Sequence, residues 1–404
     1  MVKKVRIILF ILINPTYAFK IGLENIPQQL KNDLRAKRTR IGLITNQTGV
    51  TQDGIRNIDL LRKEKLNLRA ILVPEHGLTG KAGNGESINN DIDLISKLPI
   101  ISLYKGEAKK NTCNKEDLKK LDVLLFDIQD SGMRHYTYIS TLFNVLKLGA
   151  KHNKPVIVLD RPNPLGSIME GPLVDPDKIS FISIAPVPVR HGMTIGELAR
   201  YFNTYILEKP AQLTIVPMEG YNRHRGLPKL TAMLSSGLRT KQACYAYSFL
   251  GLMGEIKPFF IGLKTDKPFE VLMISSKYKV PTSFWRTLKN IFQRFNIEAR
   301  FAQVSHPTKQ KKYIGFELNI KDINKVHSFE LFLTIAQLTQ KHNIPISFAP
   351  TFNLATGTEK VKQYILGEYS RDHLRQSVNN DLHKFYNRAR SSFLYTPTPI
   401  MTFL

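Results

Sequence analysis

Cysteine is scarce in this chain of 404 residues, which contains only Cys113 and Cys244. Two cysteines cannot form a disulfide scaffold, and there is no Cys-x-x-Cys pair or clustered Cys/His set for structural zinc. One disulfide bond between them is possible in an oxidising compartment, but two separate thiols, reduced or buried, are the simpler interpretation. The sequence therefore predicts a fold stabilised by its hydrophobic core.

Nucleotide-binding and hydrolase signatures are also missing. The glycine-rich segment after Gly77 contains Gly80-Lys81, but Ala82 follows and no glycine lies five residues before Gly80, so it is not a Walker A loop. No Gly-x-Gly-x-x-Gly follows the first predicted strand, and no Gly-x-Ser-x-Gly elbow is present. We expect no cofactor.

Long apolar runs are absent except near the N-terminus. Residues 7–13 are apolar, Lys3, Lys4 and Arg6 precede them, and Thr16-Tyr17-Ala18 resembles a cleavage site. This pattern predicts a signal peptide over residues 1–18, because the run is shorter than the roughly 20 residues that span a bilayer. A buried strand is the alternative, which the basic flank disfavours. We expect an exported protein, periplasmic or secreted, without stable membrane insertion.

Acidic residues are few, 33 against 58 lysines and arginines, and the net charge is +25. Removal of the three basic residues of the signal peptide leaves +22. Such a charge implies anionic partners. The basic residues are spread along the chain without a zinc-finger or RNA-recognition motif, so nucleic acid is not the expected partner. Anionic polymers of the cell envelope are more accessible to an exported protein.

Alternating patterns predict an α/β fold, a Rossmann-like doubly wound parallel sheet, between residues 40 and 207. Short apolar runs at 40–44, 70–73, 123–126 and 156–159 alternate with helical patterns at 58–63, 115–121, 138–152 and 194–206. Thr194 and Glu197 form a capping box at the start of the last helix.

A second, smaller domain of mixed α/β type is predicted after Pro210, because 404 residues exceed one ordinary core. Strand patterns occur at 213–218, 269–274 and 313–320, and helical patterns at 283–295, 329–342 and 370–393. Residues 219–267 show no clear periodicity. The predicted domains are residues 19–209, carrying catalysis, and 210–404, an auxiliary domain.

Polar residues follow each of the four apolar runs of the first domain. These segments are Thr45-Asn46-Gln47, Pro74-Glu75-His76-Gly77, residues 127–130 and residues 160–163. Because ligands bind beyond the carboxyl ends of parallel strands, we expect the four segments to form one site.

Two glutamates in this region are candidates for acid–base chemistry. Glu75 follows a buried strand, where partial desolvation favours a general acid, although a capping or salt-bridging role is equally open. Glu170 lies on a Gly/Pro-rich excursion ten residues after Asp160. Two facing carboxylates are what glycoside hydrolysis requires, although Glu170 alone reads as an ordinary loop residue.

Residues 127–138 supply donors, acceptors and aromatic rings that suit a sugar. They include Asp127, Gln129, Asp130, Arg134, His135, Tyr136 and Tyr138. A salt-bridged loop, with Asp130 paired to Arg134, is the alternative. Arg190-His191 precedes the capped helix, where Arg190 could clamp a carboxylate or phosphate. A metal site of His76, Asp127 and Asp160 stays open, but no ligand motif supports it and we expect none.

Several segments, taken in order, are similar to the exo-β-N-acetylmuramidases of peptidoglycan turnover. They are Gly42-Leu43-Ile44-Thr45-Asn46-Gln47-Thr48-Gly49-Val50, Pro74-Glu75-His76-Gly77-Leu78, Phe126-Asp127-Ile128-Gln129-Asp130, Tyr136-Thr137-Tyr138, Asp160-Arg161-Pro162-Asn163-Pro164, Glu170-Gly171-Pro172 and Arg190-His191-Gly192-Met193-Thr194. The similarity is specific over residues 42–198 and continues weakly to the C-terminus.

This resemblance implies an enzyme that releases N-acetylmuramic acid from the non-reducing end of β-1,4-linked peptidoglycan fragments. It implies Glu75 and Glu170 as the catalytic pair. It also implies a pocket formed by Asn46, His76, Asp127, Gln129, Arg134, Tyr136, Asn163, Arg190 and His191. The lactyl carboxylate of the sugar is then expected to pair with Arg190 or Arg134.

The chain departs from the family pattern in its middle. The family usually has Ser-Pro-Asn-hydrophobic-Pro-Thr and Glu-Gly-Arg-Gly-Thr segments, where this sequence reads Ser236-Gly237-Leu238-Arg239-Thr240 and, loosely, residues 262–270. The changed segments keep a second hypothesis open, a non-catalytic murein-binding protein that retains the cleft without the activity.

Overall fold

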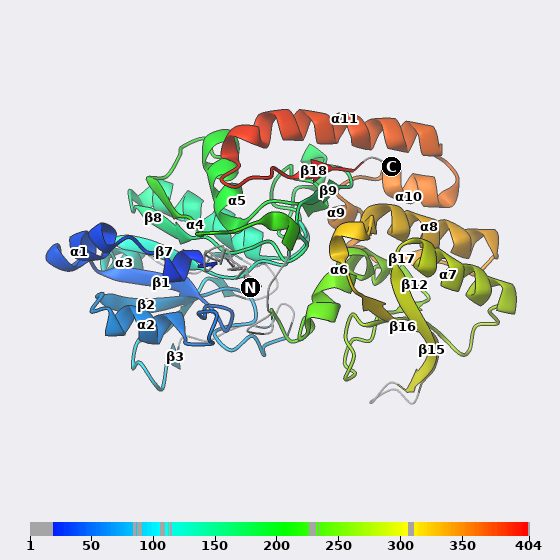
Figure 1. The fold of residues 1–404 in the computed structure, drawn as a ribbon, viewed down its shortest axis with the longest axis horizontal. Helices are drawn as coiled ribbons and strands as arrows, with labels where there is room; N and C mark the ends of the chain where they lie inside the picture. Colours follow the sequence, from blue (N-terminus) through cyan, green and yellow to red (C-terminus); the bar gives the residue numbers. More distant parts are fainter. Residues whose placement is uncertain are drawn as a thin grey trace, which may run out of the picture.

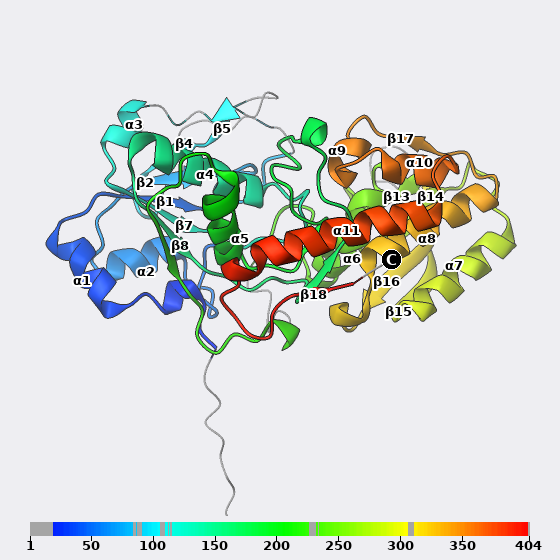
Figure 2. The same ribbon diagram turned by 90° about the horizontal axis from the view of Figure 1, so that it is seen from above.

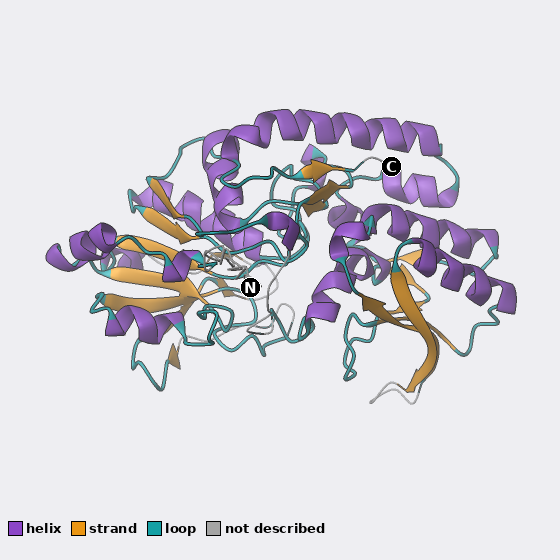
Figure 3. Ribbon diagram, viewed as in Figure 1, coloured by secondary structure: helices purple, strands orange, loops and turns teal. Residues whose placement is uncertain are grey.

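A computed structural model describes residues 19–83, 86, 91–105, 110, 111, 113, 115–225, 232, 234–305 and 311–402. The chain forms two halves joined along one side by the long helix α11 (Arg371–Ala389). Figure 3 shows strands and covering helices in both halves. The predicted signal peptide, residues 1–18, lies outside the described residues. No helix in the described part of the chain is long and apolar enough to cross a membrane.

The N-terminal half is built on a sheet of seven described strands in the order β11-β8-β7-β1-β2-β4-β3. Neighbouring strands are parallel except β3, which runs antiparallel to β4 at the edge. In chain order, β2 and β4 are added on one side of β1, and β7, β8 and β11 are then added on its other side. This reversal confirms the predicted Rossmann-like topology. The strands are β1 (Ile41–Thr45), β2 (Leu68–Val73), β3 (Asp91–Ile92), β4 (Pro99–Ser102), β7 (Val123–Asp127), β8 (Val156–Leu159) and β11 (Leu213–Val216).

Helices cover both faces of this sheet. Leu43 and Leu125 point to the face of α1 (Gln28–Ala36) and α2 (Asn57–Lys63), while Ile44 and Phe126 point to the opposite core. That core also holds residues of α3 (Lys115–Lys119), α4 (Tyr138–His152) and α5 (Ile195–Tyr201), and a π-helical turn, η3 (Phe202–Ile206), extends α5. Successive side chains of a strand point to opposite faces, so burial of both faces requires continuously apolar strands.

The C-terminal half contains an antiparallel sheet in the order β13-β14-β16-β15. The strands are β13 (Phe259–Phe260), β14 (Val271–Ser275), β15 (Ile297–Ser305) and β16 (Lys312–Ile320). The helices of this half are α6 (Lys241–Met253), α7 (Thr282–Arg294), α8 (Ser328–Lys341), α9 (Phe352–Thr356) and α10 (Lys360–Leu366). A short pair, β12 (Ile256–Lys257) with β17 (Ser347–Phe348), completes it. The predicted mixed α/β character is confirmed.

Small elements connect the two halves. In a three-stranded sheet, β9 (Ile168–Glu170) pairs with β10 (Arg190–His191) and with β18 (Ile400–Met401) from the C-terminus. The remaining short elements are β5 (Tyr104–Lys105), β6 (Lys110–Asn111), η1 (Gly22–Glu24), η2 (Pro176–Lys178), η4 (Arg223–Arg225), η5 (Ile323–Lys325) and η6 (Arg390–Ser392).

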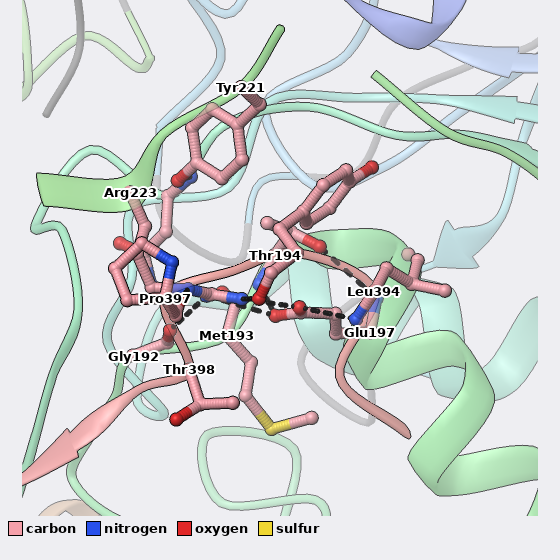
Figure 4. A network of polar contacts seen from close by, with 12 residues as sticks. Gly192, Met193, Thr194, Glu197, Tyr221, Arg223, Leu394, Pro397 and Thr398 are labelled. Atoms are coloured by element: carbon pink, nitrogen blue, oxygen red, sulfur yellow. Dashed lines mark hydrogen bonds and ion pairs between the residues drawn. The ribbon is translucent and has the colours of Figure 1, made fainter. Parts of the chain in front are cut away.

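The C-terminal segment returns to the first half of the molecule. Helix α11 lies across both halves in Figure 2, and its Phe385 ring contacts Tyr201 of α5 with ring centroids 5.0 Å apart. Arg223 attaches the C-terminal segment to the first half of the molecule. Its Nη2 pairs with Glu197 Oε1 at 2.5 Å, and its Nε donates to Pro397 O at 2.6 Å (Figure 4). Glu197 also accepts from Leu394 N and caps α5 through Thr194.

The predicted domain boundary at residue 210 lies just before β11. Strand β11 lies beyond it, yet β11 pairs with β8 at the edge of the N-terminal sheet. The segment from α11 to β18 also packs against the N-terminal half, so residues 210–404 do not form one unit. Pairings between distant segments therefore cross the predicted boundary, and a local composition change near Pro210 does not reveal them.

Candidate active site

The four polar segments meet at one edge of the large sheet. Strands β8, β7, β1 and β2 are consecutive neighbours and parallel, so their carboxyl ends bring the segments after Leu159, Asp127, Thr45 and Val73 side by side. The edge lies where the chain reverses its direction of sheet building, between β1 and β7. Ligands of open α/β sheets bind at such a switch point. The four segments predicted to form one site are thus neighbours at this edge.

Some of the predicted site residues form the framework of this edge. Asp127 is fully buried and receives Arg161 Nε at 2.6 Å, Arg161 Nη2 at 2.9 Å and Asn57 Nδ2 at 2.7 Å. Asn163 donates to Met193 O at 2.9 Å and accepts from Leu165 N at 2.8 Å. The side-chain amide of Gln129 donates to Asp130 O and Pro162 O. These groups shape the strand ends by holding the loops together.

Glu75 and His76 occupy a tight turn after β2. Both side chains are 7% exposed, and His76 has φ +73°, a left-handed conformation that is uncommon for a residue other than glycine. The His76 ring lies with Nδ1 2.7 Å from Ala82 O, so Nδ1 donates to that carbonyl. Backbone strain of this kind is often concentrated at functional sites, where the surrounding structure enforces it.

Arg134 and Arg190 are not available to a substrate carboxylate in this structure. Both are fully buried. Arg134 donates to the carbonyls of Pro172, Val187 and Ala355 and to Ser183 Oγ. Arg190 donates to the carbonyls of Leu165, Ile323 and Val326 and to Ser328 Oγ, in addition to Glu170. The expectation that either arginine pairs with a lactyl carboxylate is therefore not supported.

Glu170 is held in a buried ion pair. Its Oε1 accepts from Arg190 Nη1 at 3.1 Å and from Ser328 N at 2.9 Å, and the residue is 3% exposed. Glu170 and Arg190 are also register partners in the β9–β10 ladder. This pair joins the three-stranded sheet to the start of α8. Glu170 therefore has a structural role, which its position in the sequence does not indicate.

Asp130 is a second carboxylate at the sheet edge. Its Oδ2 accepts from Gly132 N at 2.7 Å and lies 3.2 Å from His191 Nε2. Since Met193 N donates to His191 Nδ1 at 3.3 Å, Nε2 carries the ring proton and donates to Asp130. The Asp130–Arg134 salt bridge considered as an alternative does not form, because Arg134 binds backbone carbonyls.

Buried polar atoms without a hydrogen-bond partner gather at this edge. In the described part of the chain they include Asn46 Nδ2, Asp130 Oδ1, Tyr136 Oη and both ring nitrogens of His135. Tyr136 Oη lies near Ser235 and Tyr138 but makes no hydrogen bond of normal geometry with them. A buried polar group left without a partner costs about 1–3 kcal/mol, so a polar ligand that satisfies several of them is well matched to the site.

Helix α6 of the C-terminal half provides an aromatic wall. The Tyr247 ring lies 5.8 Å from Tyr136, 5.0 Å from His135 and 4.9 Å from Phe269, measured between ring centroids. Burial raises the pKa of the Tyr247 hydroxyl, and the charges of Asp130, Glu255 and Glu75 raise it further. Tyr247 is thus within electrostatic range of both Glu75 and Asp130. The site is formed by both halves of the molecule.

Sequence patterns missed α6 because it is buried on nearly every face. Ten of its 13 residues are buried, so the helix lacks the polar face that produces a periodic pattern. The signal that could have located it is Thr240, whose Oγ1 accepts from Ala243 N at 2.9 Å as an N-cap.

The segment that departs from the family pattern forms the rim of the site. Leu234 O accepts from Gln47 Nε2 at 2.7 Å and from Tyr138 Oη at 3.0 Å, which anchors the rim over the ends of β1 and α4. The hydroxyl of Thr240 donates to Glu270, and Gly237 lies against the Phe269 ring. The two altered segments are therefore in contact with each other beside Tyr247.

The metal site considered from His76, Asp127 and Asp160 is not supported. Asp127 is paired with Arg161, and Asp160 accepts from Gly196 N, Thr194 Oγ1 and Tyr395 Oη. Among the residues that the structure describes, no three His, Cys, Asp or Glu side chains are grouped as metal ligands. Cys113 and Cys244 do not form a disulfide bond, and Cys244 is buried, so the bridge that the sequence allowed is not formed.

Comparison with known families identifies matches over most of the chain. Residues 41–235 match the N-terminal domain of the exo-beta-N-acetylmuramidase NamZ, and residues 245–395 match its C-terminal domain. The chain is also 38% identical, over 275 residues, to the peptidoglycan beta-N-acetylmuramidase NamZ of Bacillus subtilis (strain 168). That alignment covers 67% of this chain and 64% of the relative, slightly under two thirds of its length.

Two solved structures share the fold. Both are crystal structures of DUF1343 family proteins from Bacteroides fragilis NCTC 9343. One is 29% identical with a TM-score of 0.81, covering 94% of this chain and 99% of that protein. The other is 26% identical with a TM-score of 0.70, covering 93% and 99% respectively. The two-part arrangement is thus shared over nearly the whole chain.

Proposed function

Because the chain belongs to the exo-β-N-acetylmuramidase family, we propose that it hydrolyses the bond that links a terminal N-acetylmuramic acid to the rest of a peptidoglycan fragment. The sugar is released from the non-reducing end of the β-1,4-linked chain. The observation that carries the proposal is the convergence of Glu75, Asp130 and several unpaired buried polar atoms beside Tyr247. A sugar has hydroxyls for these atoms and an apolar face for the aromatic wall.

Glu75 acts as the general acid in this proposal. It lies at the end of β2 on a strained turn, 7% exposed and within electrostatic range of Tyr104, Tyr138 and Tyr247. A carboxylic acid there gives its proton to the glycosidic oxygen as the bond from that oxygen to the anomeric carbon breaks. The leaving saccharide keeps this proton as a hydroxyl.

The second carboxylate is Asp130 in this proposal, in place of Glu170. Hydrolysis adds the hydroxide of a water molecule to the anomeric carbon, and the remaining water proton passes to Asp130. The His191 Nε2–H bond to Oδ2 orients Asp130 and leaves Oδ1 without a partner. Glu170 supports the site indirectly, since its carboxylate holds Arg190 and the start of α8.

Asn46 and Tyr136 bind sugar hydroxyls in this arrangement. Asn46 Oδ1 is fixed by Thr48 N at 2.9 Å and Thr48 Oγ1 at 2.6 Å, so the side-chain amide is oriented and its Nδ2 is left to donate. His76 and Gln129 lie on the same strand ends. The remaining predicted pocket residues, Asp127, Arg134, Asn163, Arg190 and His191, act through the framework that holds these groups.

The test uses the purified protein with a chromogenic N-acetylmuramide and with a disaccharide that carries N-acetylmuramic acid at its non-reducing end. We expect release by the wild type. Glu75→Gln and Asp130→Asn should each lower kcat/KM by about 10²–10⁴, the usual range for acid–base groups. Unchanged release by Glu75→Gln contradicts its role as the acid, and a loss confined to Glu170→Gln restores Glu170 as the partner.

A murein-binding protein without catalysis is the second candidate, favoured by the altered segment at the rim. It predicts that the wild type binds the disaccharide in calorimetry and releases no sugar.

We further propose that residues 1–18 direct export, since they carry the basic, apolar and small-residue order of a signal peptide. N-terminal sequencing of the protein recovered outside the cytoplasm should begin near Phe19.

A further inference from the structure

A basic groove lies in the C-terminal half, beside strands β13, β14 and β16. Its volume is about 530 Å³, within the range of about 300–1,000 Å³ that is typical of sites for small ligands. Lysines and aromatic residues dominate the lining, and no Asp or Glu is among the described residues that form it. The lining includes Lys257, Lys264, Lys277, Lys311, Phe260 and Tyr313.

The four lysines have no acidic partner in the described part of the chain. Among the residues that the structure describes, none of the four forms an ion pair, and Lys277 lies over the Tyr278 ring at 4.9 Å. Other charges of the same sheet are neutralised, because Lys267 and Arg300 both pair with Glu317. Several like charges around one hollow repel one another, and a bound anion relieves this repulsion.

The wall of the groove is aromatic as well as basic. The rings of Phe260 and Tyr313 are stacked with centroids 4.1 Å apart and an interplanar angle of 21°. Both are partly exposed, and Leu263 beside them is 42% exposed. The groove thus presents positive charges next to an apolar platform. An acidic peptide matches this chemistry, because carboxylates meet the lysines and its methyl or methylene groups cover the rings.

One loop connects the groove with the candidate active site. The backbone closes between Phe269 N and Ile261 O at 2.7 Å, and the Phe269 ring contacts Tyr247 with centroids 4.9 Å apart. Leu263 and Lys264 of the same loop line the groove. Tyr247 lies six residues before the end of α6, about 9 Å along the helix axis, and Lys257 follows soon after. A peptide of four or five residues spans up to about 13–18 Å, which is longer than this helical segment.

We propose that this groove binds the carboxylates of an acidic peptide attached to the lactyl group of the muramyl substrate. This inference rests on the proposed function. It agrees with the burial of Arg134 and Arg190, because a lactyl group joined to a peptide is an amide and needs no arginine. The negative charge then lies further along the peptide, on its carboxylates.

The first test compares two substrates, one muramyl disaccharide without a peptide and one with a tetrapeptide that keeps its free carboxylates. The variant is the triple substitution Lys257→Gln, Lys264→Gln and Lys277→Gln. An exposed charge pair contributes a factor of about two to five, so kcat/KM for the peptide substrate should fall about tenfold or more. The value for the peptide-free substrate should stay within about twofold of wild type. An equal loss with both substrates, or no loss with either, overturns the proposal.

The matched control replaces three exposed lysines on helices away from the groove, Lys147→Gln, Lys289→Gln and Lys384→Gln. It removes the same net charge, and the preference for the peptide substrate should be unchanged. If the control loses the preference as well, the groove is not responsible.

A second test does not depend on catalysis. The free acidic tetrapeptide is titrated into the wild type, the groove variant and Glu75→Gln by calorimetry, at low and high salt. We expect binding to the wild type and to Glu75→Gln, weaker at high salt, and lost in the groove variant. This result holds even where no sugar is released, so failure of the proposed function is distinguishable. Tighter binding of inorganic polyphosphate or a single-stranded oligonucleotide, lost in the groove variant, overturns the peptide as occupant.

Discussion

Glu170 and Arg190 face each other across the β9–β10 ladder, with Arg190 Nη1 3.1 Å from Glu170 Oε1 and both side chains buried. Their positions in the sequence suggested two functional residues, one catalytic and one for an anionic group. The tertiary structure pairs them with each other and with the start of α8. The role of this enclosed pair is structural, because it holds β9, β10 and the start of α8 together.

Removal of one member of this pair should destabilise the fold. Arg190→Met leaves the Glu170 carboxylate buried without its counter-charge and frees the Leu165, Ile323 and Val326 carbonyls, so we expect a loss of about 3–5 kcal/mol. Glu170→Gln keeps the shape and should cost less. Urea unfolding measures both. Wild-type stability of Glu170→Gln together with complete loss of activity would instead favour a direct catalytic role for Glu170.

Tyr247 should affect activity more than stability. Tyr247→Phe keeps the ring contacts with Tyr136, His135 and Phe269. It removes the hydroxyl, which interacts electrostatically with Glu75 and Asp130. We expect kcat/KM on a muramyl disaccharide to fall about tenfold, the size of one lost hydrogen bond to a charged group. The control is Tyr245→Phe, two residues earlier on α6, which should leave the kinetics unchanged. Equal effects of both variants contradict the position assigned to Tyr247.

His135 should make the protein less stable in mild acid. Burial, together with the positive charge of Arg134, lowers the pKa of His135 from its usual 6.5 to about 3. The unfolded chain therefore binds a proton between about pH 6.5 and 3 that the folded protein excludes, and stability falls as the pH decreases through this window. The contribution is at most roughly 3–5 kcal/mol.

Denaturant unfolding at a series of pH values tests this expectation. The His135→Phe variant keeps a ring of similar size against Tyr247 and Gly251, and has no proton to bind. The difference in stability between variant and wild type should shift in favour of the variant as the pH falls from 7 to 4. A difference that does not change with pH shows that His135 is not buried as a neutral ring.

The Arg223–Glu197 pair should control attachment of the C-terminal segment. Arg223→Met removes the bonds to Glu197, Pro397 O and Gly192 O (Figure 4). Breaking a buried pair costs about 3–5 kcal/mol. Hydrogen exchange should then become faster in residues 390–402 and in the first turn of α5. The control is Lys20→Met, which breaks the exposed pair with Glu219 and should leave exchange in this segment unchanged.

Local patterns predicted most of the elements around the site. The boundaries of α4 and β8 agree with the predicted residues 138–152 and 156–159, because an amphipathic helix and a buried parallel strand each leave a clear pattern. The capping box of Thr194 and Glu197 is present as predicted. Helix α6 left no such pattern, because burial on nearly all sides removes the polar face that periodicity requires.

The sequence by itself determined the class of the fold and which polar segments meet, since polar residues after parallel strands must collect at one edge of the sheet. It did not determine which of those residues are free to act. Asp127, Arg134, Glu170 and Arg190 each carry suitable chemistry, and each is occupied by a partner brought from a distant segment. Pairings across about 20 to more than 200 residues, and the approach of Tyr247 from the second half, depend on tertiary packing that no local pattern contains.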